Sequence, residues 1–331
     1  MGAVAGSKRR AGRPWAQWHA CACYLAAVAL GSGCGGSART PTFELHEEEW
    51  SFEGEPGAKL TTDHFEILTT IKDRQLREAL PLFLESAYDL YVDLLPPTDA
   101  QGPRLQTYLF NTRDEWDRFT RKTFPARYPL YARIQNGGFA EGRMCVVYYM
   151  QRPYTLSVIA HEGMHQYFGA HFSTPVPPWL NEGLACYCES FDFQGDQPVF
   201  VPRKNTFRLN PLRRTLTSKT TIPLRELLAT SAGEVVGEGR GGLTQAYYSQ
   251  AWGLVVFLRH GAGGKYAAGL ERLLADVRSG TLPTRAQAAR LSTGQPGRIS
   301  PGEGVFRAYI THDLVGFERE YQAFLSELAG F

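Results

Sequence analysis

The stretch His161–Glu189, HEGMHQYFGAHFSTPVPPWLNEGLACYCE, decides how the rest of the chain is interpreted. His161 and His165 are four positions apart, so on an α-helix both imidazoles lie on one face and can reach a single metal ion. Glu162 follows the first histidine, where a carboxylate can take a proton from a zinc-bound water. The motif predicts a catalytic Zn²⁺ site with Glu162 as the general base.

Small and apolar residues around the motif support this helix. They recur at intervals of three and four positions, which predicts a stripe buried against the core: Leu156, Ile159, Ala160, Gly163, Met164 and Tyr167. The histidines and Glu162 lie on the adjacent stripe and are expected to face a cleft. Thr155 is the expected N-cap of the helix, and Gly169 is its expected end.

A catalytic zinc takes three protein ligands and keeps a fourth position open. Glu182 follows His165 by seventeen positions and is the preferred third ligand. Asn181 is the expected N-cap of a second helix that Glu182 opens. The prolines between positions 175 and 178 are expected to form a stiff loop that returns this helix to the first.

His171 is the alternative third ligand. It lies ten positions after His161, which is the spacing of the third histidine in the metzincin pattern HExxHxxGxxH. That pattern has glycine at the position that Phe168 occupies here, and glycine follows one place late. The spacing therefore favours Glu182 and leaves a metzincin-like site as the second interpretation.

The segments HEGMHQYFG and WLNEGLACYCE resemble HExxHQxFG and WLNEGxAxYxE of the aminopeptidase N-like gluzincin metallopeptidases. The gap between the second histidine and the glutamate is two residues shorter here, so the chain is more similar to the small bacterial peptidase MA-like families, which include many lipoproteins. The resemblance implies a zincin fold, Zn²⁺ as cofactor and a peptide or protein as substrate.

The resemblance also implies a catalytic tyrosine. In aminopeptidase N-like gluzincins a tyrosine about 65 positions after the ligand glutamate stabilises the oxyanion, and Tyr247 and Tyr248 fall at this spacing in a predicted helix at 243–259. The pattern Tyr-x-x-Ala-Trp that begins at Tyr248 resembles the Tyr-x-x-Ser-Trp of the peptidase MA-like families, which favours Tyr248. The alternative is a tyrosine that only packs in the core.

Glu189 lies seven positions after Glu182, two turns along the same expected helix face. It could orient a histidine ligand through the ring nitrogen that does not bind the metal. The alternative is an exposed helix carboxylate.

The order of the remaining segments predicts an α+β, zincin-like fold, with a mixed sheet before the metal helix and an α-helical C-terminal half after it. The expected strands are at 50–52, 64–68 and 104–110, with a turn at 54–57, and the expected helices are at 76–95, 114–123, 223–230, 266–277, 284–291 and 313–328. Residues 191–222 are expected to be irregular, and their six basic residues to be solvated: Arg203, Lys204, Arg208, Arg213, Arg214 and Lys219.

Residues 132–150 predict a hairpin at the sheet edge, with strands at 132–135 and 144–150. In gluzincins the edge strand above the zinc binds the substrate backbone by strand addition. Gly137 and Gly138 suit substrate binding because they lack bulk, although a tight turn uses the same residues.

Residues 1–33 are a predicted signal peptide, with four basic residues ahead of an apolar run at 20–30 that is too short for an ordinary membrane span. Cys34 follows small residues and begins a Gly/Ser-rich tether at 34–42, which resembles a bacterial lipoprotein cleavage site. Cys34 is therefore the expected lipidation residue that anchors the protein to a membrane, with ordinary secretion and an uncleaved anchor as alternatives. All three place one catalytic domain, residues 43–331, outside the cytoplasm, and lipid anchoring places it in the cell envelope.

Composition excludes some other classes. Removal of residues 1–33 leaves 31 basic and 33 acidic residues, a balance that argues against nucleic acid as a partner. Of the cysteines that remain beyond Cys34, Cys145 could pair with Cys186 or Cys188, or all three could be buried thiols.

Two other functions are compatible with the same motif. A non-catalytic envelope lipoprotein could use the scaffold for binding, but Glu162 counts against this because a structural zinc site needs no general base. A metallohydrolase that cleaves a non-peptide amide is the other.

Overall fold

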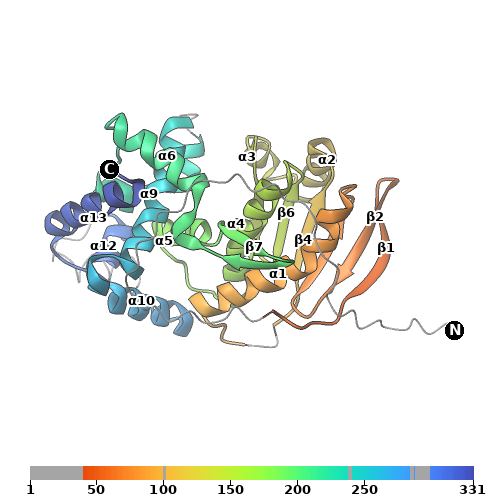
Figure 1. Cartoon of the computed structure of the whole chain (residues 1–331), viewed down its shortest axis with the longest axis horizontal. Coiled ribbons are helices and arrows are strands. Elements are labelled where there is room, and N and C mark those ends of the chain that lie inside the picture. The colour runs from red at the N-terminus through yellow and green to blue at the C-terminus, as the bar shows by residue number, and fades with distance from the viewer. Residues whose placement is uncertain (1–39, 100–101, 238–240, 284–286, 288–298) are drawn as a thin grey trace.

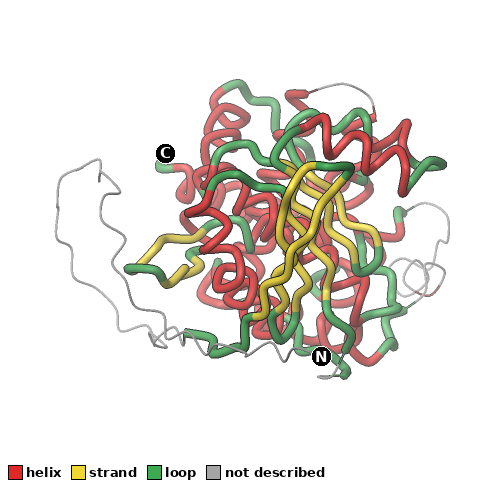
Figure 2. The backbone as a smooth tube through the Cα atoms, turned by 90° about the vertical axis from the view of Figure 1, so that its right-hand side faces the viewer, coloured by secondary structure: helices red, strands yellow, loops and turns green. Residues whose placement is uncertain are grey.

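A mixed six-stranded sheet forms the N-terminal half of the computed structural model, which describes residues 40–99, 102–237, 241–283, 287 and 299–331. The predictions for the signal peptide and Cys34, and most of the predicted helix 284–291, lie outside these residues. The strand order is β1-β2-β3-β4-β6-β5, in which β3/β4 and β4/β6 are parallel and the other pairs are antiparallel (Figures 1 and 2). The strands are β1 (His46–Phe52), β2 (Glu55–Thr61), β3 (Phe65–Thr69), β4 (Leu105–Phe110), β5 (Gly138–Glu141) and β6 (Met144–Tyr148).

Helices cover both faces of this sheet. α1 (Arg74–Leu94) and α4 (Arg152–His171) pack on one face and share the larger apolar core. α2 (Arg113–Thr123) and α3 (Tyr128–Tyr131) cover the other face, where aromatic side chains such as Trp116 and Phe139 form a second core. α4, which carries His161, Glu162 and His165, therefore lies directly against the sheet.

The C-terminal half is helical apart from the small hairpin of β7 (Phe191–Gln194) and β8 (Gln197–Phe200) (Figure 1). Its α-helices are α5 (Pro178–Tyr187), α6 (Thr206–Thr217), α7 (Leu224–Ala229), α8 (Ala232–Gly237), α9 (Gly241–His260), α10 (Ala267–Ser279), α12 (Pro301–Tyr309) and α13 (Leu314–Ala329). The prediction of an α+β chain with a mixed sheet and a helical C-terminal half is confirmed. None of the helices among the described residues is long and apolar enough to cross a membrane.

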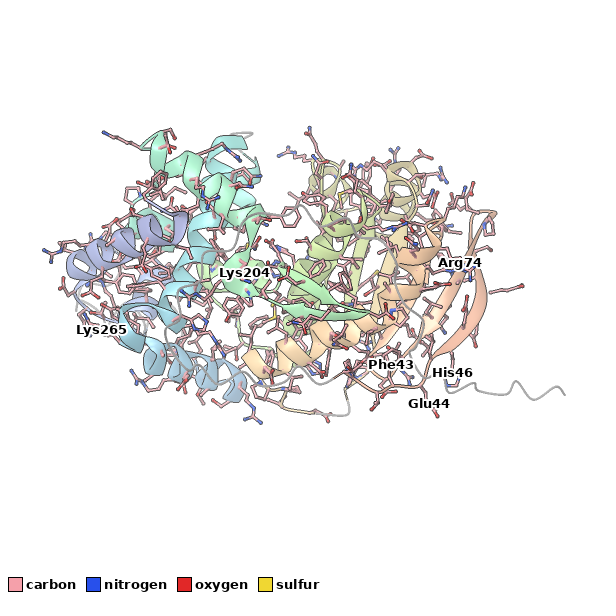
Figure 3. All side chains as sticks on the ribbon, viewed as in Figure 1. Phe43, Glu44, His46, Arg74, Lys204 and Lys265 are labelled. Carbon is pink, nitrogen blue, oxygen red and sulfur yellow. The ribbon has the colours of Figure 1, made fainter. Side chains whose placement is uncertain are left out.

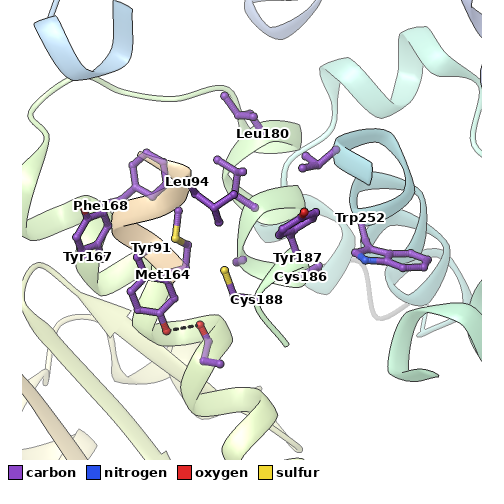
Figure 4. Packing of buried hydrophobic residues seen from close by; sticks show 14 of the residues in the cluster. Tyr91, Leu94, Met164, Tyr167, Phe168, Leu180, Cys186, Tyr187, Cys188 and Trp252 are labelled. Atoms are coloured by element: carbon purple, nitrogen blue, oxygen red, sulfur yellow. Dashed lines mark hydrogen bonds between the residues drawn. The ribbon is translucent and has the colours of Figure 1, made fainter. Parts of the chain in front are cut away.

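Four helices, α1, α4, α5 and α9, meet where the two halves join. Their packing positions the residues of α4 and α5 that were predicted to bind a metal. Tyr91 of α1 donates a hydrogen bond to the carbonyl of Ala160 in α4, at 2.8 Å (Figure 4). Gly183 allows α5 to lie close to α9, because a Cβ there would be 2.6 Å from the carbonyl oxygen of Ala251. These contacts hold α1 against α4 and α5 against α9.

Several predicted boundaries are wrong. α4 begins at Arg152, so Thr155 is not its N-cap but a buried residue whose hydroxyl accepts from the backbone N–H of Met150. Gly169 lies inside α4, where a Cβ would be 2.7 Å from the carbonyl oxygen of Gly142. Glycine is needed there for close helix–loop contact, and it does not end the helix.

Three segments were assigned the wrong structure. Residues 132–135 are not a strand; β5 begins at Gly138, and the hairpin turn lies between β5 and β6 at Gly142, whose φ is +58°. Residues 191–222 are not irregular, because they contain the β7/β8 hairpin and α6. The strand predicted at 50–52 is the end of β1. The turn predicted at 54–57 is mostly the start of β2, and Gly57 lies within that strand.

Cys145, Cys186 and Cys188 are buried free thiols, so the buried-thiol alternative holds. Cys186 and Cys188 lie in the apolar junction between α4 and α9 (Figure 4).

Exposed cations such as Arg74, Lys204 and Lys265 lie on the surfaces of both halves (Figure 3).

Candidate metal centre

Two histidines of α4 present their Nε2 atoms to the same point. The Nε2 atoms of His161 and His165 are 3.2 Å apart, as the one-turn spacing predicts. The Nδ1 atom of His161 lies 2.8 Å from Oε1 of Glu189, and that of His165 lies 3.3 Å from Oδ1 of Asn181. A ring that donates from Nδ1 to these oxygen acceptors presents the lone pair of its neutral form at Nε2.

Glu182 of α5 completes this group. Its Oε2 atom is 3.5 Å from Nε2 of His161 and 3.4 Å from Nε2 of His165. The same oxygen is buried and has no hydrogen-bond partner among the described residues. Burial opposes ionisation of Glu182, but the neighbouring His165 and His161 lower its pKa well below the usual range. The carboxylate is therefore available as a ligand.

The spacing of these three atoms fits a metal ion. Tetrahedral zinc with bonds of about 2.0–2.1 Å holds its ligand atoms about 3.3–3.4 Å apart. The observed separations are 3.2, 3.4 and 3.5 Å. Three lone-pair atoms so close together favour a cation between them, which can be a metal ion or a proton. The described residues thus include a buried group, His161, His165 and Glu182, that could hold a metal ion.

Asn181 has a different position from the one predicted. The N-cap of α5 is Pro177, and Asn181 lies inside the first turn and a half of the helix. Its amide oxygen faces His165, so it orients a ring and does not cap a helix. The helix begins earlier than predicted because Pro178 at its first position needs no N–H partner.

Glu162 lines an open cavity of about 440 Å³ that also exposes the ligand group and part of β5. Burial raises the pKa of Glu162 above its usual value. A raised pKa makes the carboxylate a stronger base, provided that it remains ionised at the working pH. Its position is that of a group that can take a proton inside the cavity.

The two candidate tyrosines differ clearly. Tyr247 is fully buried, and its hydroxyl donates to the carbonyl of Thr230 at 3.2 Å. Tyr248 lines the cavity, with its ring centroid 6.0 Å from that of His161. Burial raises the pKa of Tyr248 well above its ordinary value, so its hydroxyl keeps its proton. Of these two tyrosines, only Tyr248 lines the cavity.

Glu189 is buried, with 3% of its side chain exposed, so it is not an exposed helix carboxylate. Burial opposes its ionisation, but the charge of Arg208 and hydrogen bonds from His161 and Arg208 lower the pKa of Glu189 to about 2. α5 ends at Tyr187, so Glu189 reaches His161 from just beyond the helix.

Of the two glycines, Gly138 is the one that the site requires. A Cβ on Gly138 would be 2.6 Å from Cγ2 of Val147, 2.8 Å from the carbonyl oxygen of Val146 and 3.4 Å from Cγ of Glu162. A Cβ on Gly137 would meet the side chain of Ile134 at 3.4 Å, and the φ of Gly137, +156°, favours glycine for backbone conformation and not for access to the site. Gly138 therefore lets β5 lie close to the base.

His171 lies apart from the ligand group. Its Nε2 atom is 3.4 Å from the hydroxyl of Tyr88, and its ring packs on Tyr167 with a centroid distance of 4.7 Å. The described metal-competent groups contain His161, His165 and Glu182, or His161, Cys186 and Glu189, and neither contains His171.

Arg208 is the residue that the sequence analysis assigned to the wrong environment. It was expected on a solvated surface, yet its side chain is 16% exposed and forms a salt bridge with Glu189. Asn205, one turn earlier, donates to the same carboxylate at 2.8 Å. No local pattern indicates these contacts, because α6 is separated from the metal helix by α5 and the β7/β8 hairpin.

Fold and site together define an α+β protein with a buried histidine and glutamate group that could bind a metal. Residues 155–273 match a family model described as a protein of unknown function, DUF1570. The matched segment contains the ligand group, Glu162, Glu189 and Tyr248. No curated protein matches the chain.

Proposed function

We propose that the protein is a zinc-dependent peptide-bond hydrolase of the gluzincin type, built on a zincin-like fold. The observation that supports this most strongly is the set of three ligand atoms at tetrahedral spacing, with Oε2 of Glu182 buried and unpartnered. Glu162 at the same cavity favours a catalytic site over a structural one, which needs no base.

His161, His165 and Glu182 would hold the ion, which supplies Lewis acidity toward water and toward the substrate carbonyl. Glu162 takes the proton from the attacking water and can return it to the leaving nitrogen. The hydroxyl of Tyr248 donates a hydrogen bond to the oxyanion that develops on the carbonyl oxygen. Glu189 and Asn181 keep both imidazoles oriented, with Nε2 directed at the ion.

β5 would bind the substrate backbone by strand addition. It is the last strand of the sheet, and no described strand pairs with its outer edge. Gly138 and Ala140 line the cavity on this strand, so an extended peptide can approach Glu162 closely. A peptide bound along β5 is thereby placed beside the base and the ligand group.

A mixed peptide library tests the reaction itself. Zinc-loaded protein should cleave peptide bonds and generate new N-termini, and a chelator should stop the cleavage until zinc is restored. Absence of new N-termini from metal-loaded protein would favour the non-catalytic envelope protein.

Tyr248→Phe should lower kcat by about a hundredfold or more, because it removes one donor to the oxyanion. The steady-state rate with a cleaved peptide measures this change. Tyr247→Phe is the control: it removes a hydroxyl that bonds only Thr230 and should leave kcat nearly unchanged. A loss of kcat in Tyr247→Phe alone would show that the wrong tyrosine was chosen.

Export and lipid anchoring at Cys34 are also proposals. Cys34→Ser should move the protein from the membrane fraction to the soluble fraction, since the lipid is attached through that thiol. Fractionation of cells that express each form measures the change. A variant that stays in the membrane fraction would favour an uncleaved N-terminal anchor.

A further inference from the structure

We infer that Arg208 of α6 is a positioning residue for the metal centre, which fixes Glu189 and through it the orientation of His161, and which also contacts the ring of Tyr248. The inference rests on the proposed metal site, but it concerns a helix outside the metal-binding segment. Arg208 lies forty-seven positions after His161, in the stretch whose basic residues were expected to be solvated.

The first contact is a two-pronged salt bridge. Nε of Arg208 donates to Oε2 of Glu189 at 2.7 Å, and Nη2 donates to Oε1. This arrangement fixes the plane of the carboxylate as well as its position. Lysine has no such fork and could supply only a single contact.

The remaining contacts of the carboxylate leave it little freedom. Oε1 of Glu189 also accepts from Nδ1 of His161, and Oε2 accepts from Nδ2 of Asn205 at 2.8 Å. Asn205 also donates to the carbonyl of Cys186 at 2.9 Å, which ties α6 to α5. A carboxylate held in this way sets both the tautomer and the tilt of the His161 ring.

Arg208 also contacts the candidate oxyanion donor. Its guanidinium carbon lies 5.0 Å from the ring centroid of Tyr248, within the range of a cation–π contact. One side chain therefore touches both the group that orients a ligand and the ring that carries the catalytic hydroxyl.

Charge gives a second reason for arginine at this position. The side chain of Glu189 is 3% exposed and that of Arg208 is 16% exposed. A buried carboxylate without a cationic partner is strongly unfavourable, and two further carboxylates, Glu182 and Glu162, line the cavity together with His161, the partner of Glu189. Arg208 balances the charge of Glu189, so this carboxylate can accept from His161 without adding net charge.

The test is the zinc affinity of the apoprotein, measured by competition with a chromophoric chelator. Arg208→Met should weaken zinc binding about 10- to 100-fold, as expected when a partner that orients a ligand is lost. Arg208→Lys keeps the charge but loses the fork, and should also bind zinc more weakly than the wild type. In steady-state assays with a cleaved peptide, Arg208→Met should lower kcat more than it changes KM.

Arg213→Met is the matched control, because Arg213 lies on the same helix and donates to the carbonyl of Ala329, away from the site. It should keep the wild-type zinc affinity. The double variant Glu189→Gln, Arg208→Met should bind zinc no more weakly than Glu189→Gln alone, since Arg208 acts through Glu189.

Wild-type zinc affinity in Arg208→Met, or additive losses in the double variant, would overturn the positioning role while leaving the metal centre intact. If Arg208→Met shows no cooperative thermal unfolding, Arg208→Lys decides the question, and wild-type affinity in that variant would overturn the role. A wild-type protein that binds no zinc would instead overturn the proposed metal centre, and the role of Arg208 with it.

Discussion

Replacement of Glu162 by glutamine should abolish hydrolysis while the protein keeps its fold and its zinc. The amide has nearly the same shape as the carboxylate but cannot take a proton from the attacking water. Loss of a general base costs typically about 10²- to 10⁴-fold in rate. Glu162 is not one of the three converging ligand atoms, so the metal content of the purified variant should match that of the wild type.

Rate and metal content must be measured on the same sample. A rate lost together with zinc would show that Glu162 contributes to metal binding. Full activity in a zinc-loaded Glu162→Gln variant would remove the proposed mechanism, because no other carboxylate among the described residues lines the cavity except Glu182.

Local pattern was enough to predict the elements that carry the metal group. The histidine pair lies on a helix because its spacing and the apolar stripe around it repeat with the helical period. The helices at 76–95, 114–123 and 243–259 were predicted within a few residues for the same reason. The helix ends were less predictable: Thr155 and Gly169 have the composition of caps, yet both are used for packing inside α4.

Glycine pairs and basic runs were misread because one residue type serves several purposes. Gly137 and Gly138 could form a turn or allow close approach, and only the contacts of Gly138 with Val147 and Glu162 distinguish the two. Arg208 has the sequence context of a surface residue. Arg208 can be buried because it pairs with Glu189, which lies just beyond α5. The two residues are far enough apart in the sequence that no local pattern indicates this contact.

Asn181 is another residue whose role the sequence pattern did not predict correctly. Its position just before Glu182 suits an N-cap, but the helix begins at Pro178 and the amide then faces α4. The return of α5 to α4 was predicted from the prolines of the connecting loop, but these prolines do not determine the register of α5 against α4 that brings Asn181 to His165. That register decides which side chain meets His165.

The zinc content of two variants, Glu182→Ala and His171→Ala, distinguishes a gluzincin-type site from a metzincin-like one. Glu182→Ala removes the oxygen that lies 3.4–3.5 Å from both Nε2 atoms. Two protein ligands hold zinc poorly, so the purified variant should lose its zinc under mild chelation. His171→Ala should keep its zinc, because His171 contacts Tyr88 and not the ligand group.

Thermal unfolding gives an independent reading of the same change. Zinc binds the folded state, so chelation should lower the Tm of the wild type and of His171→Ala. The Tm of Glu182→Ala should be almost insensitive to the chelator, since little zinc is bound to begin with. If zinc were instead lost from His171→Ala and kept by Glu182→Ala, the site would be metzincin-like. That result would contradict both the gluzincin ligand set and the role inferred for Tyr248, because both depend on Glu182 as the third ligand.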